Sequence, residues 1–382
     1  MSAEVMATVT GPFSLAKTRR IVGDLFEPRP LVYWTDFTLS IFTGHSLFLA
    51  AVWVSTWWSG PAWLGLIIRL ISLLVCALLY YRCAMFIHEL AHFRANQMRG
   101  FRCWWSWWCG ATFLMPPFVY DNHVDHHRSH DFATDRDGEY LPLAFRPRYQ
   151  IVFLLLQSLV IPPLACIRFG VLTPLTWLSP SLRNLVHQRA SSMVIDPAYV
   201  RPLPCGRRLF WIRVQEFVCF AWCVFLMVAL STFLRPWALT FIMQAYGVAV
   251  SIIFLNAVRT LGAHRYHNTG GEVTFLEQVL DSVNYPRGLL TELWAPTGTR
   301  YHALHHMLPG LPYHALPAAH RRLMRELPDD SPYRLTEGES LWSALQLLWV
   351  RAGASHGSPP ASFRNGERSE TSSIMVKVAN SS

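Results

Sequence analysis

Long apolar stretches alternate with polar, histidine-containing segments along the chain. The first two apolar stretches cover residues 37–58 and 62–86, on either side of a short Ser-Gly-Pro turn. Two more cover residues 217–234 and 237–258, and only an Arg-Pro pair separates them. Because about 20 apolar residues suffice for a helix to cross a bilayer, the pattern predicts four transmembrane helices arranged as two hairpins.

A fifth apolar stretch, residues 151–172, has a different character. It contains the adjacent prolines Pro162 and Pro163 and the charged Arg168. Proline in a helix interior removes a hydrogen bond and clashes with the preceding turn. We therefore predict an interfacial or re-entrant segment here. Arg69, within the second apolar stretch, has to face protein or reach the membrane surface.

Composition agrees with a membrane protein. Of 382 residues, 52% are hydrophobic and only 15% are charged, whereas charged residues make up about 25% of an ordinary soluble domain. The formal net charge of +9 could suggest nucleic acid. Beside long apolar stretches, however, arginines are better explained as markers of the cytoplasmic face and its anionic lipids, so no nucleic-acid partner is expected.

The charge distribution also predicts the topology. Four spans place residues 1–36, 87–208 and 259–382, which carry most arginines, on one side of the membrane. By the positive-inside rule that side is the cytoplasm. We expect an all-α polytopic protein with a cytoplasmic N-terminal segment (1–35), a membrane domain (36–335) whose cytoplasmic helical cap carries the histidines, and a disordered tail (354–382).

Three histidine groups lie on this predicted cytoplasmic side. Residues three or four apart share one face of a helix, so each group can direct several imidazoles into one pocket. Neutral imidazole suits iron, zinc, copper and nickel, and eight clustered imidazoles exceed the coordination shell of one ion. Two metal ions are therefore expected. The groups are His88 and His92; His123, His126 and His127; and His302, His305 and His306.

A ninth ligand is expected directly after the fourth span. His264 leaves the membrane there on the predicted cytoplasmic side, as His88 does after the second span. His267 is the weaker choice. Of the other histidines, His45 is expected to form a hydrogen bond within the first span, and His187 and His356 to lie on the surface.

The segment His-Glu-Leu-Ala-His at residues 88–92 also matches a zinc-hydrolase motif, in which the glutamate is the general base. An intramembrane zinc protease would need a further acidic ligand from a later span. The chain offers only Leu-Asp-Ser at residues 280–282, outside any predicted span. Zinc hydrolysis would also leave the other two histidine groups unused, so Glu89 is expected to orient a ligand instead.

The three boxes HELAH, HVDHH and HALHH, in this order between paired spans, resemble those of the integral-membrane fatty acid desaturase superfamily. The resemblance covers roughly residues 35–330. The third box precedes Leu-Pro-Gly-Leu-Pro-Tyr-His, a context similar to that of acyl-lipid desaturases.

A membrane-bound metal transporter is the non-enzymatic alternative, but it would need polar residues along several spans.

The resemblance implies a non-haem di-iron oxidoreductase that uses O2 to introduce a double bond into a fatty acyl chain. It implies two iron ions and an external electron donor, namely a ferredoxin, a rubredoxin or cytochrome b5 with its reductase. A related lipid hydroxylase, a ketolase and an alkene-forming decarboxylase stay as alternatives. The implied iron ligands are His88, His92, His123, His126, His127, His264, His302, His305 and His306.

Further polar residues are expected around these ligands, and no separate catalytic base is expected. In some relatives an asparagine stands one helical turn before the extra histidine, where this chain has Thr260. Carboxylates commonly bond the outer nitrogens of ligating histidines, and Asp121, Asp137, Glu139 and Glu292 are candidates for this role. The residues expected around the ligands are Glu89, Asp125, His130, Thr260, His267 and Asp281.

Overall fold

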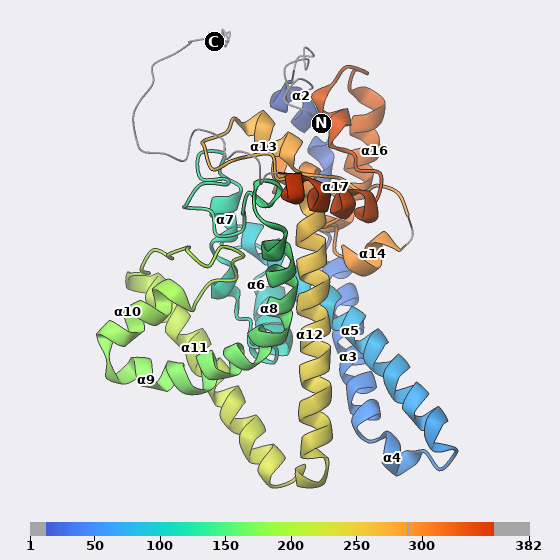
Figure 1. Ribbon diagram of the computed structural model, residues 1–382, viewed down its shortest axis with the longest axis vertical. Helices are drawn as coiled ribbons and strands as arrows, with labels where there is room; N and C mark the ends of the chain where they lie inside the picture. The colour runs from blue at the N-terminus through green and yellow to red at the C-terminus, as the bar shows by residue number, and fades with distance from the viewer. Residues whose placement is uncertain (1–12, 289, 355–382) are drawn as a thin grey trace.

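Long helices extend side by side through one part of the molecule, and many of the shorter helices gather at one of their ends (Figure 1). The computed structural model describes residues 13–288 and 290–354. Within these residues it contains helices and isolated backbone bridges but no named strand. The predicted all-α polytopic architecture is therefore confirmed. Of the predicted disordered tail (354–382), only Ala354 is described, as the last residue of a helix, and the rest of the tail and His356 lie outside the described residues.

The long helices are α3 (Pro30–Val52), α5 (Ala62–His92), α8 (Arg148–Ile167), α11 (Gly206–Ser231) and α12 (Ala238–Ala263). The shorter α-helices are α2 (Leu15–Ile21), α4 (Val54–Trp57), α6 (Arg99–Trp105), α7 (His123–His126), α9 (Thr173–Leu178), α10 (Pro180–Arg189), α13 (Phe275–Asp281), α14 (Thr291–Trp294), α15 (His302–Met307), α16 (Leu316–Glu326) and α17 (Leu341–Ala354). Two π-helical turns, η2 (Ser106–Ala111) and η5 (Arg168–Leu172), interrupt the chain. The 3₁₀ turns are η1 (Gly23–Leu25), η3 (Pro117–Tyr120), η4 (Leu143–Phe145), η6 (Arg235–Trp237), η7 (Tyr313–Ala315) and η8 (Pro332–Thr336).

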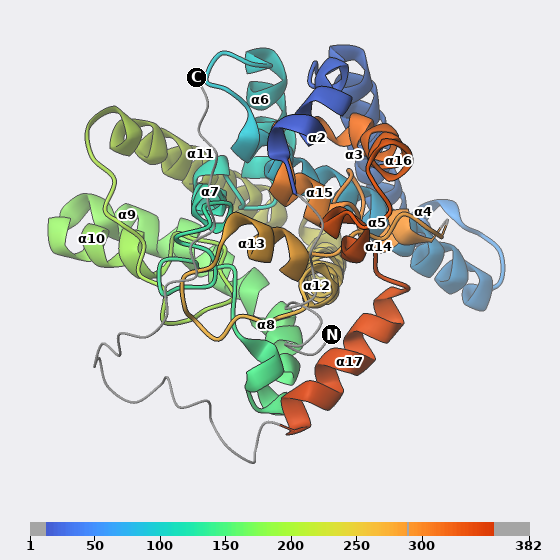
Figure 2. The same ribbon diagram turned by 90° about the horizontal axis from the view of Figure 1, so that it is seen from above.

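Four stretches among the described residues are long and apolar enough to cross a bilayer: Ala62–His92, Arg148–Leu178, Gly206–Ser231 and Arg235–Ala263. Three of them agree with the predicted spans. The remaining stretch, Arg148–Leu178, is the one that contains the two prolines. The predicted first span is not among the four, and it divides into α3 and the short α4. Helix α3 still packs along α5 (Figures 1 and 2), and α11 and α12 meet at η6 and then diverge.

The two prolines in α8 do not break the helix, contrary to the sequence argument. Pro163 has no N–H with which to bond the carbonyl of Leu159, four residues earlier. The Tyr246 hydroxyl of α12 donates to that carbonyl at 3.0 Å, so a neighbouring helix satisfies the freed acceptor. The chain then bends through η5 and continues by α9 and α10 to the start of α11 (Figure 1). The interfacial or re-entrant placement of this segment stays a prediction.

Replacing Tyr246 with phenylalanine is expected to destabilise the protein by about 0.5–1.5 kcal/mol, because the Leu159 carbonyl then loses its donor. Thermal unfolding of the detergent-solubilised protein measures this loss. Tyr149→Phe is the matched control, since the Tyr149 side chain is 66% exposed. Equal midpoints for both variants would show that the hydroxyl does not compensate for the proline.

A buried ion pair connects η5 with α11. Arg168 donates to the Glu216 carboxylate of α11, to the Ala190 carbonyl at 2.8 Å and to the Ser191 hydroxyl at 2.9 Å. His187 Nε2 lies 3.2 Å from the same carboxylate. The predicted surface position of His187 is therefore wrong: its side chain is buried because Glu216 supplies a partner inside the protein.

Polar side chains between α3 and α5 also have partners. His45 Nδ1 lies 2.5 Å from the Tyr80 hydroxyl, as expected of a hydrogen-bonded histidine within the first helix. Arg69 Nε donates to the Ala51 carbonyl at 3.1 Å, so this arginine faces protein backbone.

At the capped end, α2 packs against α16.

Candidate metal centre

The nine histidines converge where the long helices end and the cap begins. His88 and His92 occupy the last turns of α5, and His264 directly follows α12. The other two boxes form the short helices α7 and α15. Because α5 and α12 pack against each other, their adjacent ends bring the first box and His264 to one place.

Two groups of nitrogen atoms result, and neither group equals a single box. In each group one ring nitrogen per histidine lies within 4.8 Å of all the others. His305 Nε2 is 3.0 Å from His92 Nε2 and 3.1 Å from His127 Nε2. The five-histidine group is His88, His92, His123, His127 and His305, and the four-histidine group is His126, His264, His302 and His306.

The spacing of these nitrogens fits coordination of a metal ion. His264 Nε2 lies 3.2 Å from His126 Nε2 and 3.0 Å from His302 Nε2. Two nitrogens at right angles on one ion, each about 2.1 Å from it, would be about 3.0 Å apart. His88 Nε2 is buried and has no hydrogen-bond partner, as expected of a lone pair kept for a metal. Both groups can therefore hold an ion.

Protonation also favours coordination, because a ligating imidazole must be neutral. Five histidines have a pKa well below the ordinary value. Burial is the main cause, and the charge of neighbouring histidines lowers the pKa further. They are His123, His127, His302, His305 and His306. Burial also acts on His126, but the Asp137 carboxylate outweighs it and raises the pKa of that histidine.

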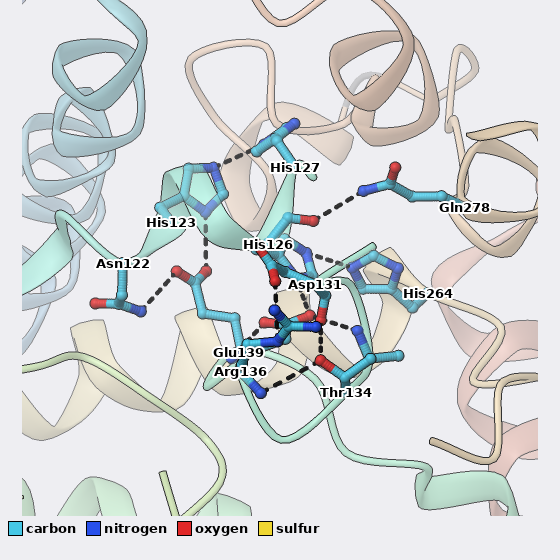
Figure 3. Close-up of polar contacts among 12 residues, drawn as sticks. Asn122, His123, His126, His127, Asp131, Thr134, Arg136, Glu139, His264 and Gln278 are labelled. Atoms are coloured by element: carbon cyan, nitrogen blue, oxygen red, sulfur yellow. Dashed lines mark hydrogen bonds and ion pairs between the residues drawn. The ribbon is translucent and has the colours of Figure 1, made fainter. Parts of the chain in front are cut away.

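Three acidic residues, two of them buried and Glu139 half-buried, lie beside the outer nitrogens of three histidine rings, and Figure 3 shows the contact between Glu139 and His123. The Asp137 carboxylate lies 2.8 Å from His126 Nδ1, and the Glu139 carboxylate lies 3.0 Å from His123 Nδ1. Asp281 of α13 lies 3.3 Å from His264 Nδ1 as an ion-pair contact, and the Ser282 hydroxyl lies 3.4 Å from the same nitrogen. A carboxylate that holds Nδ1–H leaves the Nε2 lone pair for the metal.

Asp137 is the most firmly placed of the three. It accepts N–H bonds from Ala133 and Glu139, each at 2.9 Å. Burial raises the pKa of Asp137, but His126 and these N–H groups lower it below its ordinary value. The residue is therefore an ionised, preoriented acceptor for His126.

Replacing Asp137 with asparagine is expected to weaken metal binding about 10- to 100-fold, the usual cost of losing such a partner. Metal titration of the purified protein measures the affinity. Asp125→Asn is the matched control, since Asp125 pairs with Arg128 at 2.8 Å instead of with a histidine. Equal affinities for the two variants would contradict the assigned role of Asp137.

The other candidate residues lie farther from the rings. Glu89 is buried and accepts bonds from the Tyr33 hydroxyl and the Tyr313 N–H, so its carboxylate joins helices. The side chain of His130 is 62% exposed beside Asp131.

His267 and Thr260 also have other partners. His267 Nε2 lies 2.5 Å from Arg351, and the Thr260 hydroxyl accepts from Arg259 at 3.3 Å. Asp121 pairs with Arg201 and Arg208, and Glu292 with Arg82 and Arg300.

Sequence reasoning missed two residues beside the histidines. Gln278 donates to the His126 carbonyl at 2.8 Å and lies 3.3 Å from His306 Nδ1. Tyr120 stacks on the His123 ring, with centroids 4.6 Å apart, and donates to Glu139. Tyr120 precedes the second box closely and could have been considered for that reason, whereas nothing in the local sequence distinguishes Gln278.

Comparison with known proteins gives two matches. A family model described as fatty acid desaturase matches residues 61–337. The ceramide hydroxylase of Caulobacter vibrioides (strain NA1000 / CB15N) is 36% identical over 350 residues, which cover 91% of this chain and 96% of that protein. The family match spans all three boxes and His264.

Proposed function

The chain belongs to the fatty acid desaturase family, and we propose that within this family of lipid oxidoreductases it hydroxylates a ceramide-type lipid, using O2 and two iron ions. The observation that carries the proposal is the pair of histidine groups at the ends of α5 and α12, of which only His92 and His127 are half-buried and the rest are buried. The similarity to a ceramide hydroxylase over nearly the whole length of both chains supports the choice of reaction. We assign the catalytic unit to residues 36–335.

We propose the nine histidines as the ligands, five for one ion and four for the other. Bound iron would supply the redox chemistry for O2-dependent C–H oxidation, which zinc cannot provide. The chain's own contribution is to desolvate most of the imidazoles, which favours their neutral form, and to place Glu139, Asp137 and Asp281 beside the Nδ1 atoms of His123, His126 and His264. All-imidazole ligation distinguishes this centre from the carboxylate-rich di-iron bundles.

In the proposed reaction, one oxygen atom of O2 enters a C–H bond of the lipid, and the other leaves as water. This balance requires two electrons and two protons from outside the lipid. A ferredoxin, a rubredoxin or cytochrome b5 with its reductase is the proposed donor, because the sequence contains no His-Pro-Gly-Gly haem motif. The arginine-rich cap would face the cytoplasm, where such donors are found.

Desaturation of a fatty acyl chain was the expectation from the sequence, and the hydroxylase relative favours the stated alternative instead. Desaturation stays as the second candidate because the third box and the following Pro-Gly-Leu-Pro segment resemble those of acyl-lipid desaturases. Both reactions need the same metal centre, so the histidine geometry is equally consistent with each.

Lipid analysis of an expressing host separates the two reactions. Cells that lack this activity are grown under heavy-isotope O2 with the chain or with its His302→Ala variant, and their lipids are analysed by tandem mass spectrometry. We expect ceramides with one additional labelled oxygen from the wild-type chain only. A new double bond without labelled oxygen would select desaturation, and unchanged lipids together with bound zinc would refute both.

A further inference from the structure

Arg259 is a buried cation next to the candidate metal centre. It lies in α12, one to two turns before His264, and its side chain is only 7% exposed. A rise of 1.5 Å per residue puts it about 7.5 Å along the helix from His264, on the side from which a lipid would arrive.

The arginine is held in place but has one free donor. Its Nε donates to Asn256 at 3.2 Å, and one terminal nitrogen donates to the Thr260 hydroxyl at 3.3 Å. The other terminal nitrogen, Nη1, is buried and has no hydrogen-bond partner. Tyr81 of α5 lies close enough for its hydroxyl oxygen to interact with this guanidinium, but it makes no hydrogen bond with Nη1, and its proton goes to the Trp294 carbonyl at 2.9 Å.

No carboxylate of the described residues lies within 4 Å of this guanidinium, whereas Arg82, Arg168 and Arg201 each have an acidic partner. A buried charge without a partner is costly. Two metal cations in the adjacent groups would increase that cost. A group that brings an oxygen atom to Nη1 would offset it.

We propose that Arg259 Nη1 binds an oxygen atom of the lipid, a hydroxyl or an amide carbonyl, close to the carbon that is oxidised. The inference rests on the proposed function and specifies its substrate class. A fatty acyl chain oxidised at a methylene far from its head group would bring only hydrocarbon to this donor. A ceramide carries hydroxyl and amide oxygens near its head and can satisfy the donor while its chains stay in the membrane.

Anaerobic lipid binding to the purified, iron-loaded full chain tests this without turnover. The two probes are a ceramide and n-hexadecane, which has no oxygen, each competing with a fluorescent ceramide. Because hydrogen bonds to charged groups are the stronger class, Arg259→Leu is expected to weaken ceramide binding about 10- to 100-fold and to leave hexadecane binding unchanged. Arg259→Lys, which keeps the charge, is expected to be intermediate.

Arg69→Leu is the matched control. It removes another arginine from a long helix, roughly 28 Å along α5 from His88, and is expected to change neither affinity. Unchanged ceramide binding by Arg259→Leu with normal iron content would overturn the inference. If that variant fails to fold, Arg259→Lys with wild-type ceramide affinity would overturn it equally.

The same experiment separates this inference from the proposed function. Arg259-dependent ceramide binding without any hydroxylated product would refute the reaction and support the binding role. Hydroxylated ceramide together with Arg259-independent binding would support the reaction and refute the binding role.

Discussion

Replacing His264 with alanine is expected to weaken iron binding in the four-histidine group by more than about 100-fold, beyond the usual effect of an outer-shell residue. Iron content after dialysis against a weak chelator should fall toward about one ion per chain, because only three protein ligands are left in that group. Lipid oxidation should be lost with the ion. Elemental analysis and mass spectrometry of host lipids measure the two effects.

His267→Ala is the matched control for His264→Ala. His267 is three residues away and was the weaker choice for the ninth ligand, but its ring is paired with Arg351. The control should keep both its iron and its activity. Loss of iron from the His267 variant, with retention in the His264 variant, would show that the wrong histidine has been assigned.

The convergence of the boxes could be predicted because the spacing of histidines and the lengths of apolar stretches are local properties of the sequence. His264 could be predicted as the ninth ligand because it follows the fourth predicted span, whose cytoplasmic end lies on the same side of the membrane as the end of the second span. The division of the nine histidines into two groups could not be predicted, because His126 and His127 are adjacent in sequence yet belong to different groups. That division depends on how α7 lies between α5 and α15.

The partners of the histidines were only partly predictable. Six acidic residues were plausible, and Asp137, Glu139 and Asp281 are those that contact rings. Asp121 and Asp125 are just as close to the second box in sequence, but nearby arginines pair with them. The sequence shows which charged residues are present, whereas tertiary packing determines which of them lie close enough to pair.

The uninterrupted α8 is a second case in which a partner distant in sequence decides the structure. Local chemistry correctly identifies Pro163 as a residue that leaves a carbonyl unpaired, and the inferred break fails because Tyr246, far along the chain, donates to that carbonyl. Arg259 is the opposite case. Its sequence position suggested nothing, and only the absence of a partner for its buried Nη1 among the described residues draws attention to it.

Replacing His305 with alanine is expected to abolish lipid oxidation while much of the iron is retained. Four histidines are left in its group, a number sufficient to hold an ion. His305 nevertheless connects two boxes, since its Nε2 lies 3.0 Å from His92 and 3.1 Å from His127. Its removal opens a position on the ion to water and frees both rings to move, so we expect product to fall by more than about 100-fold.

His320→Ala is the control for a buried histidine outside both groups. His320 lies 2.8 Å from the Tyr333 hydroxyl and 3.0 Å from the Glu337 carboxylate, so its loss should lower the unfolding midpoint without removing iron. Comparison of His305→Ala with His264→Ala then tests the division itself. Five ligands tolerate the loss of one better than four do, and equal iron loss from the two variants would show that the nine histidines do not act as separate groups of five and four.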